Sequence, residues 1–233
     1  MTVEANDGKQ LVTEVDGVRY ERIPIKTRLV VDGDDISQIV TEFAAPLVQA
    51  GDVLFVTEKI VAIAQGRAYP IDSVTPRPLA RWLSQRVTKT PAGIGLGMPE
   101  TMEMALQECG VPRIVFAAGV AAITKLFGRR GDFYRIAGTQ ARGIDGPTSG
   151  TIPPYNHYVV LAPAKPDAVA RELRELLGGR AEVVIVDMND LGGDIIGSTV
   201  SASVTKRIRS VLLDNPLGQG HQSTPMGIIR PAS

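Results

Sequence analysis

The sequence has one cysteine, few aromatic residues and no long apolar run, and each shortage excludes a class of protein. A single cysteine among 233 residues, Cys109, excludes a disulfide framework and any zinc site built from several cysteines. No stretch reaches the roughly 18 consecutive apolar residues that a membrane-spanning helix needs. Aromatic residues make up only 5% of the chain, which leaves few rings on which single-stranded nucleic acid could stack.

An excess of either charge is also lacking. The 25 Lys and Arg residues balance 25 Asp and Glu residues, so the chain does not have the basic surplus typical of nonspecific binding to nucleic acid or membrane surfaces. Its first residues are polar and acidic and contain no apolar core of a signal peptide. We therefore expect a soluble cytoplasmic protein that binds neither nucleic acid nor membrane.

Three common catalytic signatures are missing as well. The sequence contains no G-x-x-x-x-G-K-[ST], no G-x-S-x-G and no H-E-x-x-H. His157 and His221 are the only histidines, and nothing supports a Ser-His-Asp triad around them. Cys109 lies in an expected helix, where we interpret it as a small core thiol. The sequence therefore offers no supported covalent nucleophile.

Hydrophobic periodicity predicts strands and helices in mixed order, which indicates an α/β or α+β protein with a mixed sheet and flanking helices. A turn at Asp16-Gly17 makes residues 10–22 an edge strand or hairpin. The apolar segment 113–126 and residues 133–137 are expected to form a second hairpin, and the Gly/Pro-rich C-terminal tail to be coil. The remaining expected strands are 23–31, 53–56, 158–161 and 182–186. The expected helices are 36–47, 79–87, 99–109 and 166–177. Residues 58–64 could extend the strand at 53–56 or begin a helix, and we favour a helix that ends near Gly66.

The strongest candidate for chemistry is Asp187, which follows the apolar run 183–186. This position puts a carboxylate at the carboxyl end of a buried strand, where open α/β sheets bind ligands. Asn189, Asp190 and Asp194 follow within one glycine-rich turn. Such oxygen ligands suit Mg²⁺ or Mn²⁺ held together with nucleotide phosphates. From the residues alone, a helix cap or turn carboxylate is an equal alternative.

Three further charged residues have weaker support. Asp145 lies in the Gly/Pro/Thr/Ser-rich loop 138–154, where a simple turn residue is the alternative. Lys59 and Arg67 follow the strand at 53–56 and could neutralise phosphate or bind a carboxylate, Arg67 in a bidentate manner. A solvated surface charge is the alternative for each of them.

Residues 51–67 resemble the coenzyme F420-0:L-glutamate ligase (F420 gamma-glutamyl ligase) family, in which G-D and four apolar residues precede K-[IV]-V-x-x-x-E-G-R. Other blocks agree in order. Residues 143–145 are similar to the family's G-V-D-x-S-N, 160–167 to its L-P and D-P-D, and 184–187 to its V-I-x-D. The resemblance runs from about residue 23 to 197, and the 51–67 block is its most specific part.

The resemblance implies the family's distinctive α/β fold, an intertwined homodimer and a ligase activity. Family enzymes add L-glutamate through an amide bond to a carboxylate acceptor such as coenzyme F420-0, with GTP and Mg²⁺ or Mn²⁺, and K⁺ is a further candidate cation. Carried over by position, Asp145 and Asp187 would bind the metal, with Asp190 or Asp194 assisting.

The resemblance also suggests which residues contact the other ligands. Lys59 and Arg67 are expected to touch phosphate or substrate carboxylate, as catalytic and cofactor-binding residues, and Asn156 to bind the cofactor. We expect residues 1–18 to be an N-terminal edge segment and residues 19–233 a single ligase-like domain.

Three departures from the family pattern leave alternatives open. Gln65 stands in place of the family's Glu, Gly146-Pro147 replaces the end of G-V-D-x-S-N, and residues 187–194 contain none of the family's arginines. They motivate two alternatives, a folate-type gamma-glutamyl ligase and a non-catalytic relative that binds a nucleotide or flavin-like ligand. Separately, the apolar run 114–126 around Gly119 exceeds what a lone hairpin can bury, which predicts a homodimer.

Overall fold

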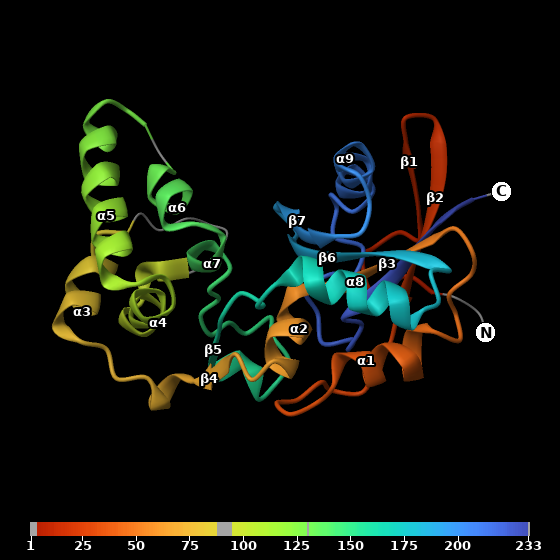
Figure 1. The fold of residues 1–233 in the computed structure, drawn as a ribbon, viewed down its shortest axis with the longest axis horizontal. Helices are drawn as coiled ribbons and strands as arrows, with labels where there is room; N and C mark the ends of the chain where they lie inside the picture. The colour runs from red at the N-terminus through yellow and green to blue at the C-terminus, as the bar shows by residue number, and fades with distance from the viewer. Residues whose placement is uncertain (1–3, 88–94, 130, 233) are drawn as a thin grey trace. The chain divides into compact units, whose positions relative to one another are not determined.

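The chain forms two compact units, and the second is inserted into the first. A computed structural model describes residues 4–87, 95–129 and 131–232. Unit 1 comprises Met1–Gly66 and Ala164–Ser233, and unit 2 comprises Arg67–Pro163. Figure 1 shows the course of the chain through both units. Each unit is described below by itself.

Unit 1 contains a six-stranded sheet with the strand order β1-β2-β8-β3-β6-β7. Only β3 and β6 run parallel, and all the other neighbouring pairs are antiparallel. The predicted α/β class with a mixed sheet is therefore confirmed. The strands are β1 (Val12–Val15), β2 (Val18–Ile25), β3 (Asp52–Thr57), β6 (Ala181–Asn189), β7 (Gly192–Ser198) and β8 (Met226–Pro231).

Helices cover both faces of this sheet. Figure 1 shows α9 (Ala202–Val211) on one face and the other helices of unit 1 on the opposite face. Phe55 and Val184 pack on the α9 side, while Leu54 and Val56 alternate with them and are also fully buried. A strand buried on both faces has an unbroken apolar run, as residues 53–56 do. The helices of the opposite face are α1 (Ile36–Ile39) with its π-helical continuation η1 (Val40–Ala44), α2 (Glu58–Ala64) and α8 (Pro166–Leu176).

The predicted N-terminal hairpin is confirmed. Asp16 and Gly17 both have positive φ, 53° and 75°, which is the geometry of the tight turn that favours Asp-Gly. The turn joins β1 to β2 in the register Val15↔Val18. Residues 1–18, the expected edge segment, therefore contain β1, which is the edge strand of the sheet in unit 1.

The described part of unit 2 is mainly helical and contains a small antiparallel sheet formed by β4 and β5. Leu96, Met102, Leu106, Ile114 and Ile144 are fully buried in its core. Its elements are β4 (Ala68–Pro70), η2 (Ile71–Ser73), α3 (Pro78–Ser84), η3 (Gly95–Gly97), α4 (Pro99–Cys109), α5 (Val111–Leu126), α6 (Asp132–Ala137), α7 (Thr139–Arg142), η4 (Tyr155–His157) and β5 (Tyr158–Val160).

The second predicted hairpin is wrong, because residues 113–126 and 133–137 form helices α5 and α6. Composition misleads here, since an apolar run rich in β-branched residues fits a buried strand and a helix equally well. Two local signals favour the helix. Pro112 stands in its first turn, and Gly110, at φ 85°, ends α4 and allows α5 to begin.

The predicted coil at the C-terminal end is also wrong in part. Residues 226–231 of this Gly/Pro-rich tail form β8, which lies in the interior of the sheet between β2 and β3. Gly227 in β8 lies against Phe55 and the backbone of Ile23, where a side chain would not fit. The glycine that resembles a coil signal thus allows close packing inside the sheet.

Within the described ranges no single helix is long and apolar enough to cross a membrane. Helices α4 and α5 meet the criteria of length and hydropathy only as a pair, which bends by 117° at the break between them.

Gly227 and Gly119 should respond in opposite ways to alanine. A Cβ at residue 227 would lie 2.6 Å from the ring of Phe55 and 2.8 Å from the carbonyl oxygen of Ile23. We expect Gly227→Ala to lower the free energy of unfolding by about 1–3 kcal/mol, because the core would be overpacked. Gly119 lies in α5, where an added Cβ would have nothing within 4 Å, and Gly119→Ala should stabilise by about 0.5–1 kcal/mol. Urea unfolding of both variants tests this, and an unchanged stability of Gly227→Ala would contradict the packing.

Candidate functional site

The carboxyl end of β3 brings candidate residues close to Asp187 of β6, a strand that continues beyond the pairing with β3 as far as Asn189. The two strands are parallel, and Thr57 pairs with Val186 at the end of β3. Lys59 therefore follows β3, in the first turn of α2, at the same edge where Asp187 follows Val186. The backbone N–H of Thr57 donates to the carbonyl of Pro225 at 3.0 Å, so the start of β8 also lies there. We refer to this region as the carboxyl edge.

Charged side chains at the carboxyl edge are partly withdrawn from solvent. Glu58 is buried, and Lys59 and Asp187 are half-buried. All three take part in polar or electrostatic interactions within the protein. Glu58 was not among the candidates found from the sequence, although its position beside Lys59 and directly after a buried strand was a usable signal.

Asp187 and Asp194 face each other across the β6–β7 hairpin. They are register partners, so both side chains lie on the same face of the sheet. Like charges directly opposite one another repel, and a cation between or beside them relieves that repulsion. Arg209 supplies part of the positive charge that offsets this repulsion, because its Nε lies 3.4 Å from Oδ1 of Asp194. The structure thus brings together two of the four predicted metal ligands.

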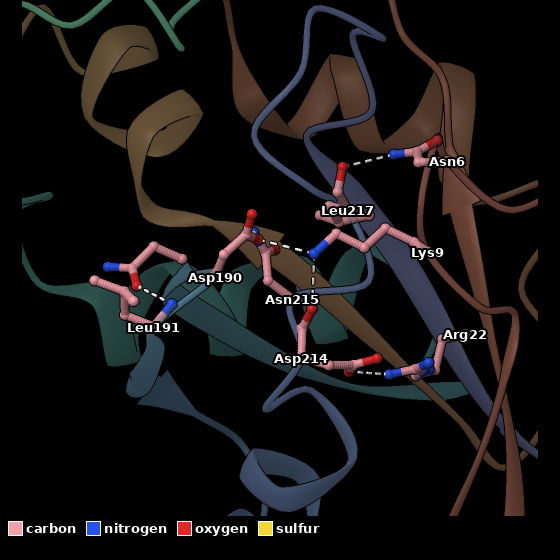
Figure 2. A network of polar contacts seen from close by, with 9 residues as sticks. Asn6, Lys9, Arg22, Asp190, Leu191, Asp214, Asn215 and Leu217 are labelled. Carbon is pink, nitrogen blue, oxygen red and sulfur yellow. Dashed lines mark hydrogen bonds and ion pairs between the residues drawn. The ribbon is translucent and has the colours of Figure 1, made fainter. Parts of the chain in front are cut away.

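Asp190 has a different environment, in the turn between β6 and β7. Its Oδ1 accepts hydrogen bonds from Nζ of Lys9 at 2.8 Å and from Nδ2 of Asn215 at 2.9 Å (Figure 2). The hydrogen bond from Lys9 lowers the pKa of the Asp190 carboxyl below its ordinary value and outweighs the opposing effect of burial. Its role as a metal ligand remains a prediction, and its observed role is to bind the N-terminal segment to this turn.

The same network continues through Asp214. Lys9 also donates to the carbonyl of Asp214 at 2.9 Å, and the buried guanidinium of Arg22 donates to the Asp214 carboxylate (Figure 2). Arg22 also donates to the carbonyls of Val211 and Gln10. These bonds connect β2 to the end of α9, and sequence reasoning did not find them.

In the part of the chain that the structure describes, no group of three or more His, Cys, Asp or Glu side chains is arranged to hold a metal ion. Asp187, Asp190 and Asp194 belong to unit 1 and Asp145 belongs to unit 2. Mg²⁺ commonly takes only one or two carboxylates and completes its shell with water and phosphate oxygens. A site with two protein carboxylates is consistent with that chemistry.

Asp145 is held at the small sheet of unit 2. Its N–H donates to the carbonyl of Val160 at 2.8 Å, and its carbonyl accepts from the N–H of Val160 at 2.9 Å. This bridge fixes the half-buried Asp145 beside β5. Asn156 lies just before β5 in η4, and its Oδ1 is buried without a hydrogen-bond partner among the described residues. A buried acceptor without a donor among the described residues is costly in free energy, and the predicted role of Asn156 in binding the cofactor stays a prediction.

Arg67 has structural partners in unit 2. Its Nε donates to the carbonyl of Ala162 at 2.7 Å, and one terminal nitrogen lies 2.5 Å from Oε1 of Glu108. The backbone carbonyl of Arg67 accepts from the N–H of Leu161. These bonds give Arg67 a structural role in unit 2. Its predicted contact with phosphate or carboxylate stays a prediction.

Gln65 forms a paired hydrogen bond with one residue of unit 1. Its Oε1 accepts from the N–H of Ala164 at 2.7 Å, and its Nε2 donates to the carbonyl of Ala164 at 3.1 Å. A glutamate at this position could accept the first bond but, when ionised, could not donate the second. The departure from the family's Glu therefore adds a hydrogen bond at residue 164, where unit 1 resumes.

The fold and the candidate residues define a mixed α/β protein in which Lys59 and Asp187 lie near the carboxyl end of β3. A comparison with family models matches F420-0:Gamma-glutamyl ligase over residues 24–212, and the chain belongs to this family. The match covers most of the chain and includes every candidate residue named above from Lys59 to Asp194.

Curated relatives agree with the family. The coenzyme F420:L-glutamate ligase of Methanopyrus kandleri is 29% identical over 192 residues, which cover 80% of this chain and 66% of that protein. The proteins of the same name from Methanosarcina mazei and Archaeoglobus fulgidus are 23% and 24% identical over 74% and 82% of this chain. The chain spans 60% and 70% of the length of these two relatives, respectively.

Replacing Gln65 with glutamate should destabilise the protein in a pH-dependent manner. At neutral pH the carboxylate would lose the bond to the Ala164 carbonyl and face that oxygen, at a cost of about 1–3 kcal/mol. On acidification the protonated side chain can donate again, so the difference from wild type should shrink. Chemical unfolding of Gln65→Glu and wild type at neutral and acidic pH measures this. A difference that does not change with pH would contradict the paired bond.

Proposed function

We propose that this protein is a nucleotide- and divalent-metal-dependent ligase that adds L-glutamate through an amide bond to a carboxylate acceptor such as coenzyme F420-0. The observation that carries the proposal is the family match over residues 24–212, which spans both units. The names of the three relatives describe the same kind of ligation.

The reaction needs activation of the acceptor carboxylate. A carboxylate oxygen of the acceptor attacks the γ-phosphorus of GTP and releases GDP, which leaves an acyl phosphate. The amine of glutamate then attacks the acyl carbon, phosphate departs, and the nitrogen loses a proton. These steps depend on positioning and on neutralisation of phosphate charge rather than on a covalent nucleophile of the protein. The lack of a supported Cys or Ser nucleophile in the sequence agrees with this mechanism.

The residues of the carboxyl edge suit the charge requirements of that reaction. Asp187, with Asp194 opposite, provides carboxylate oxygens that favour Mg²⁺ or Mn²⁺, and Asp145, in unit 2, is the other proposed ligand. The metal, when bound, neutralises phosphate charge. Lys59 at the end of β3 would add a positive charge toward phosphate or substrate carboxylate, and Arg67 is a second candidate. K⁺ is a further candidate cation.

One observation favours a non-catalytic relative as the second candidate. Residues 187–194 contain no arginine, whereas the family pattern has arginines there. A chain that keeps the carboxylates but lacks these cations could bind a nucleotide or flavin-like ligand without turnover. A folate acceptor in place of F420-0 is the catalytic alternative.

A phosphate-release assay separates these candidates. With GTP, Mn²⁺, L-glutamate and F420-0, we expect phosphate release that depends on glutamate and a product heavier by one glutamyl residue. Parallel reactions with ATP and with a folate acceptor determine the nucleotide and acceptor. Calorimetric binding of GTP without glutamate-dependent turnover of either acceptor would contradict the ligase proposal and favour the non-catalytic relative.

Asp187→Asn tests the metal ligand. The change keeps the size of the side chain but removes its negative charge, so GTP affinity in Mn²⁺ should fall by at least about tenfold, a loss seen even for outer-shell partners of metal sites. Binding without metal should change much less. Stability of the ligand-free protein should hold or rise slightly, because repulsion from Asp194 is relieved. Thermal melts with and without Mn²⁺ and GTP measure both effects. Full stabilisation by Mn²⁺ and GTP in the variant would show that Asp187 is not a ligand.

We also propose that the protein is a homodimer that associates through the exposed face of α5. Val115, Phe116, Ile123 and Leu126 recur at helical spacing on this face, and their exposed fractions range from 43% to 83%. Gly119 lies in the middle with open space above it. Contiguous apolar patches of this kind mark interfaces. The apolar surface that suggested a dimer thus belongs to a helix rather than to the predicted hairpin.

Leu126→Lys should weaken the dimer. A charged side chain in an apolar interface is costly to desolvate, so light scattering at micromolar concentration should give a monomer mass for the variant and a dimer mass for wild type. Leu191→Lys is the matched control, because Leu191 is 71% exposed in a hairpin turn outside α5. A wild-type monomer would contradict the proposal, and so would a dimer that both variants retain.

A further inference from the structure

Asp187 and Asp194 lie in the part of the β6–β7 hairpin that extends beyond the pairing with β3. That pairing ends at Val186, which lies opposite Thr57, the last residue of β3. Asp187 then pairs with Asp194 across the hairpin, and β7 is the edge strand of the sheet. A two-stranded ribbon is only marginally stable by itself. The positions of the two carboxylates therefore depend on what holds residues 187–194, which we call the hairpin tip.

The turn of the hairpin tip is held through Asp190. Its Oδ1 accepts one hydrogen bond from Nζ of Lys9 at 2.8 Å and another from Nδ2 of Asn215 at 2.9 Å (Figure 2). The side chain of Asp190 is 49% exposed, but that of Lys9 is only 15% exposed and Asn215 is buried. Hydrogen bonds to an ionised carboxylate are stronger than those between neutral groups. Two largely shielded donors thus fix an exposed turn.

Lys9 is itself fixed by contacts with the body of unit 1. Its Nζ also donates to the carbonyl of Asp214 at 2.9 Å, and the carboxylate of Asp214 is bound by the buried Arg22 of β2 (Figure 2). The methylene groups of Lys9 lie beside Gly218, where an added Cβ would be 3.5 Å from Cε of the lysine. The hairpin tip is therefore connected through Lys9 to an interior strand of the sheet.

We propose that Lys9 is a positioning residue for the metal ligands. It holds Asp190, which fixes the hairpin tip and keeps Asp187 and Asp194 opposite one another, so that one divalent cation can bind both. This inference rests on the proposed function in one respect, because that function places Mg²⁺ or Mn²⁺ at this pair. Asp190 then anchors the tip and does not contact the metal, in contrast to the ligand role expected from the sequence.

A second contact limits the size of the expected effect. Nε of Arg209 donates to the carbonyl of Gly193 at 2.7 Å, so the β7 side of the hairpin tip has its own support from α9. Loss of Lys9 should therefore loosen the tip without unfolding it. One partly exposed charge pair contributes little free energy, which corresponds to a change in metal affinity of about two- to fivefold.

Lys9→Met tests the positioning role on the full chain. The variant keeps the apolar part of the side chain and removes the ammonium group. Loss of a positive charge by itself favours binding of a cation, so weaker binding of Mn²⁺ reports loss of position rather than of charge. We expect an affinity for Mn²⁺ alone that is lower by about two- to fivefold, measured from the electron paramagnetic resonance signal of the free ion.

Hydrogen exchange measures the same effect without metal. In Lys9→Met, backbone amides of residues 187–194 should exchange faster, while those of β3 should not change. Lys206→Met is the matched control, because it removes the same charge from an exposed lysine of α9. This control should not weaken binding of Mn²⁺ or change exchange in the hairpin tip.

Variants of Asp190 distinguish an anchor from a metal ligand. Asp190→Asn keeps an oxygen that can accept from Lys9 and Asn215, so it should retain most of the affinity for Mn²⁺. Asp190→Ala removes the acceptor and should weaken binding at least as much as Lys9→Met does. The double variant Lys9→Met, Asp190→Ala should show no further loss, because Lys9 acts through Asp190. Independent losses that add would show that Lys9 does not act in this way.

Failure of this inference and failure of the proposed function give different results. If the wild type binds Mn²⁺ and Lys9→Met binds it equally tightly, the positioning role is wrong and the ligase proposal is unaffected. The same holds if exchange in the hairpin tip becomes faster but the affinity does not fall, because the contact is then structural only. If the wild type binds no Mn²⁺, the metal site of the proposed function is wrong, and the positioning role with it.

Discussion

The parallel pairing of β3 with β6 is the constraint on which the rest of unit 1 depends. Two parallel strands cannot be joined by a tight turn, because the chain must return to the starting end of the sheet. Here the return includes α2, all of unit 2 and α8, so the insertion lies within the one crossover that a parallel pair requires. The register from Asp52↔Ala181 to Thr57↔Val186 then fixes which residues emerge together at the carboxyl edge.

The last strand of the chain completes this edge. β8 separates β2 from β3, and Met226 pairs with both Ile25 and Val56. The carbonyl of the preceding residue, Pro225, accepts from the first backbone N–H beyond that pair, on Thr57. The ends of β2 and β3 and the start of β8 therefore meet at the edge that presents Lys59. This arrangement needs a residue without a side chain at 227, since Phe55 occupies the space.

Local patterns predicted the elements that carry strong periodicity or clear end signals. The apolar run 53–56, the helix from Glu58 and the helix that begins at Pro166 were all visible in the sequence and lie where expected. α5 was mistaken for a strand because its residues are apolar on nearly every face, which removes the period that distinguishes the two. β8 was missed because its glycine and flanking prolines resemble a loop signal. Each error arises where tertiary packing, rather than local preference, decides the structure.

Long-range polar contacts could not be predicted at all. Lys9 and Asp190 are separated by 181 residues, and no local pattern links them. The sequence grouped Asp187, Asp190 and Asp194 as one acidic turn, but a hairpin alternates its side chains and gives its turn residues separate partners. Asp187 and Asp194 share a face, whereas Asp190 binds the N-terminal segment. The geometry of the hairpin therefore places carboxylates that are close in the sequence in two different environments.

The chain passes from unit 1 to unit 2 after Gly66 and returns to unit 1 after Pro163. Residues next to these two points are hydrogen-bonded to each other within each unit. In unit 1 the side chain of Gln65 pairs with the backbone of Ala164, and in unit 2 Arg67 bonds to Leu161 and Ala162. Residues 65–67 and 161–164 are thus linked at successive positions. The sequence predicts that Arg67, at the end of the family motif, contacts phosphate or substrate carboxylate, and this stays a prediction. Gln65 and Arg67 also have a structural role, because their hydrogen bonds join the segment in which the chain leaves unit 1 to the segment in which it returns.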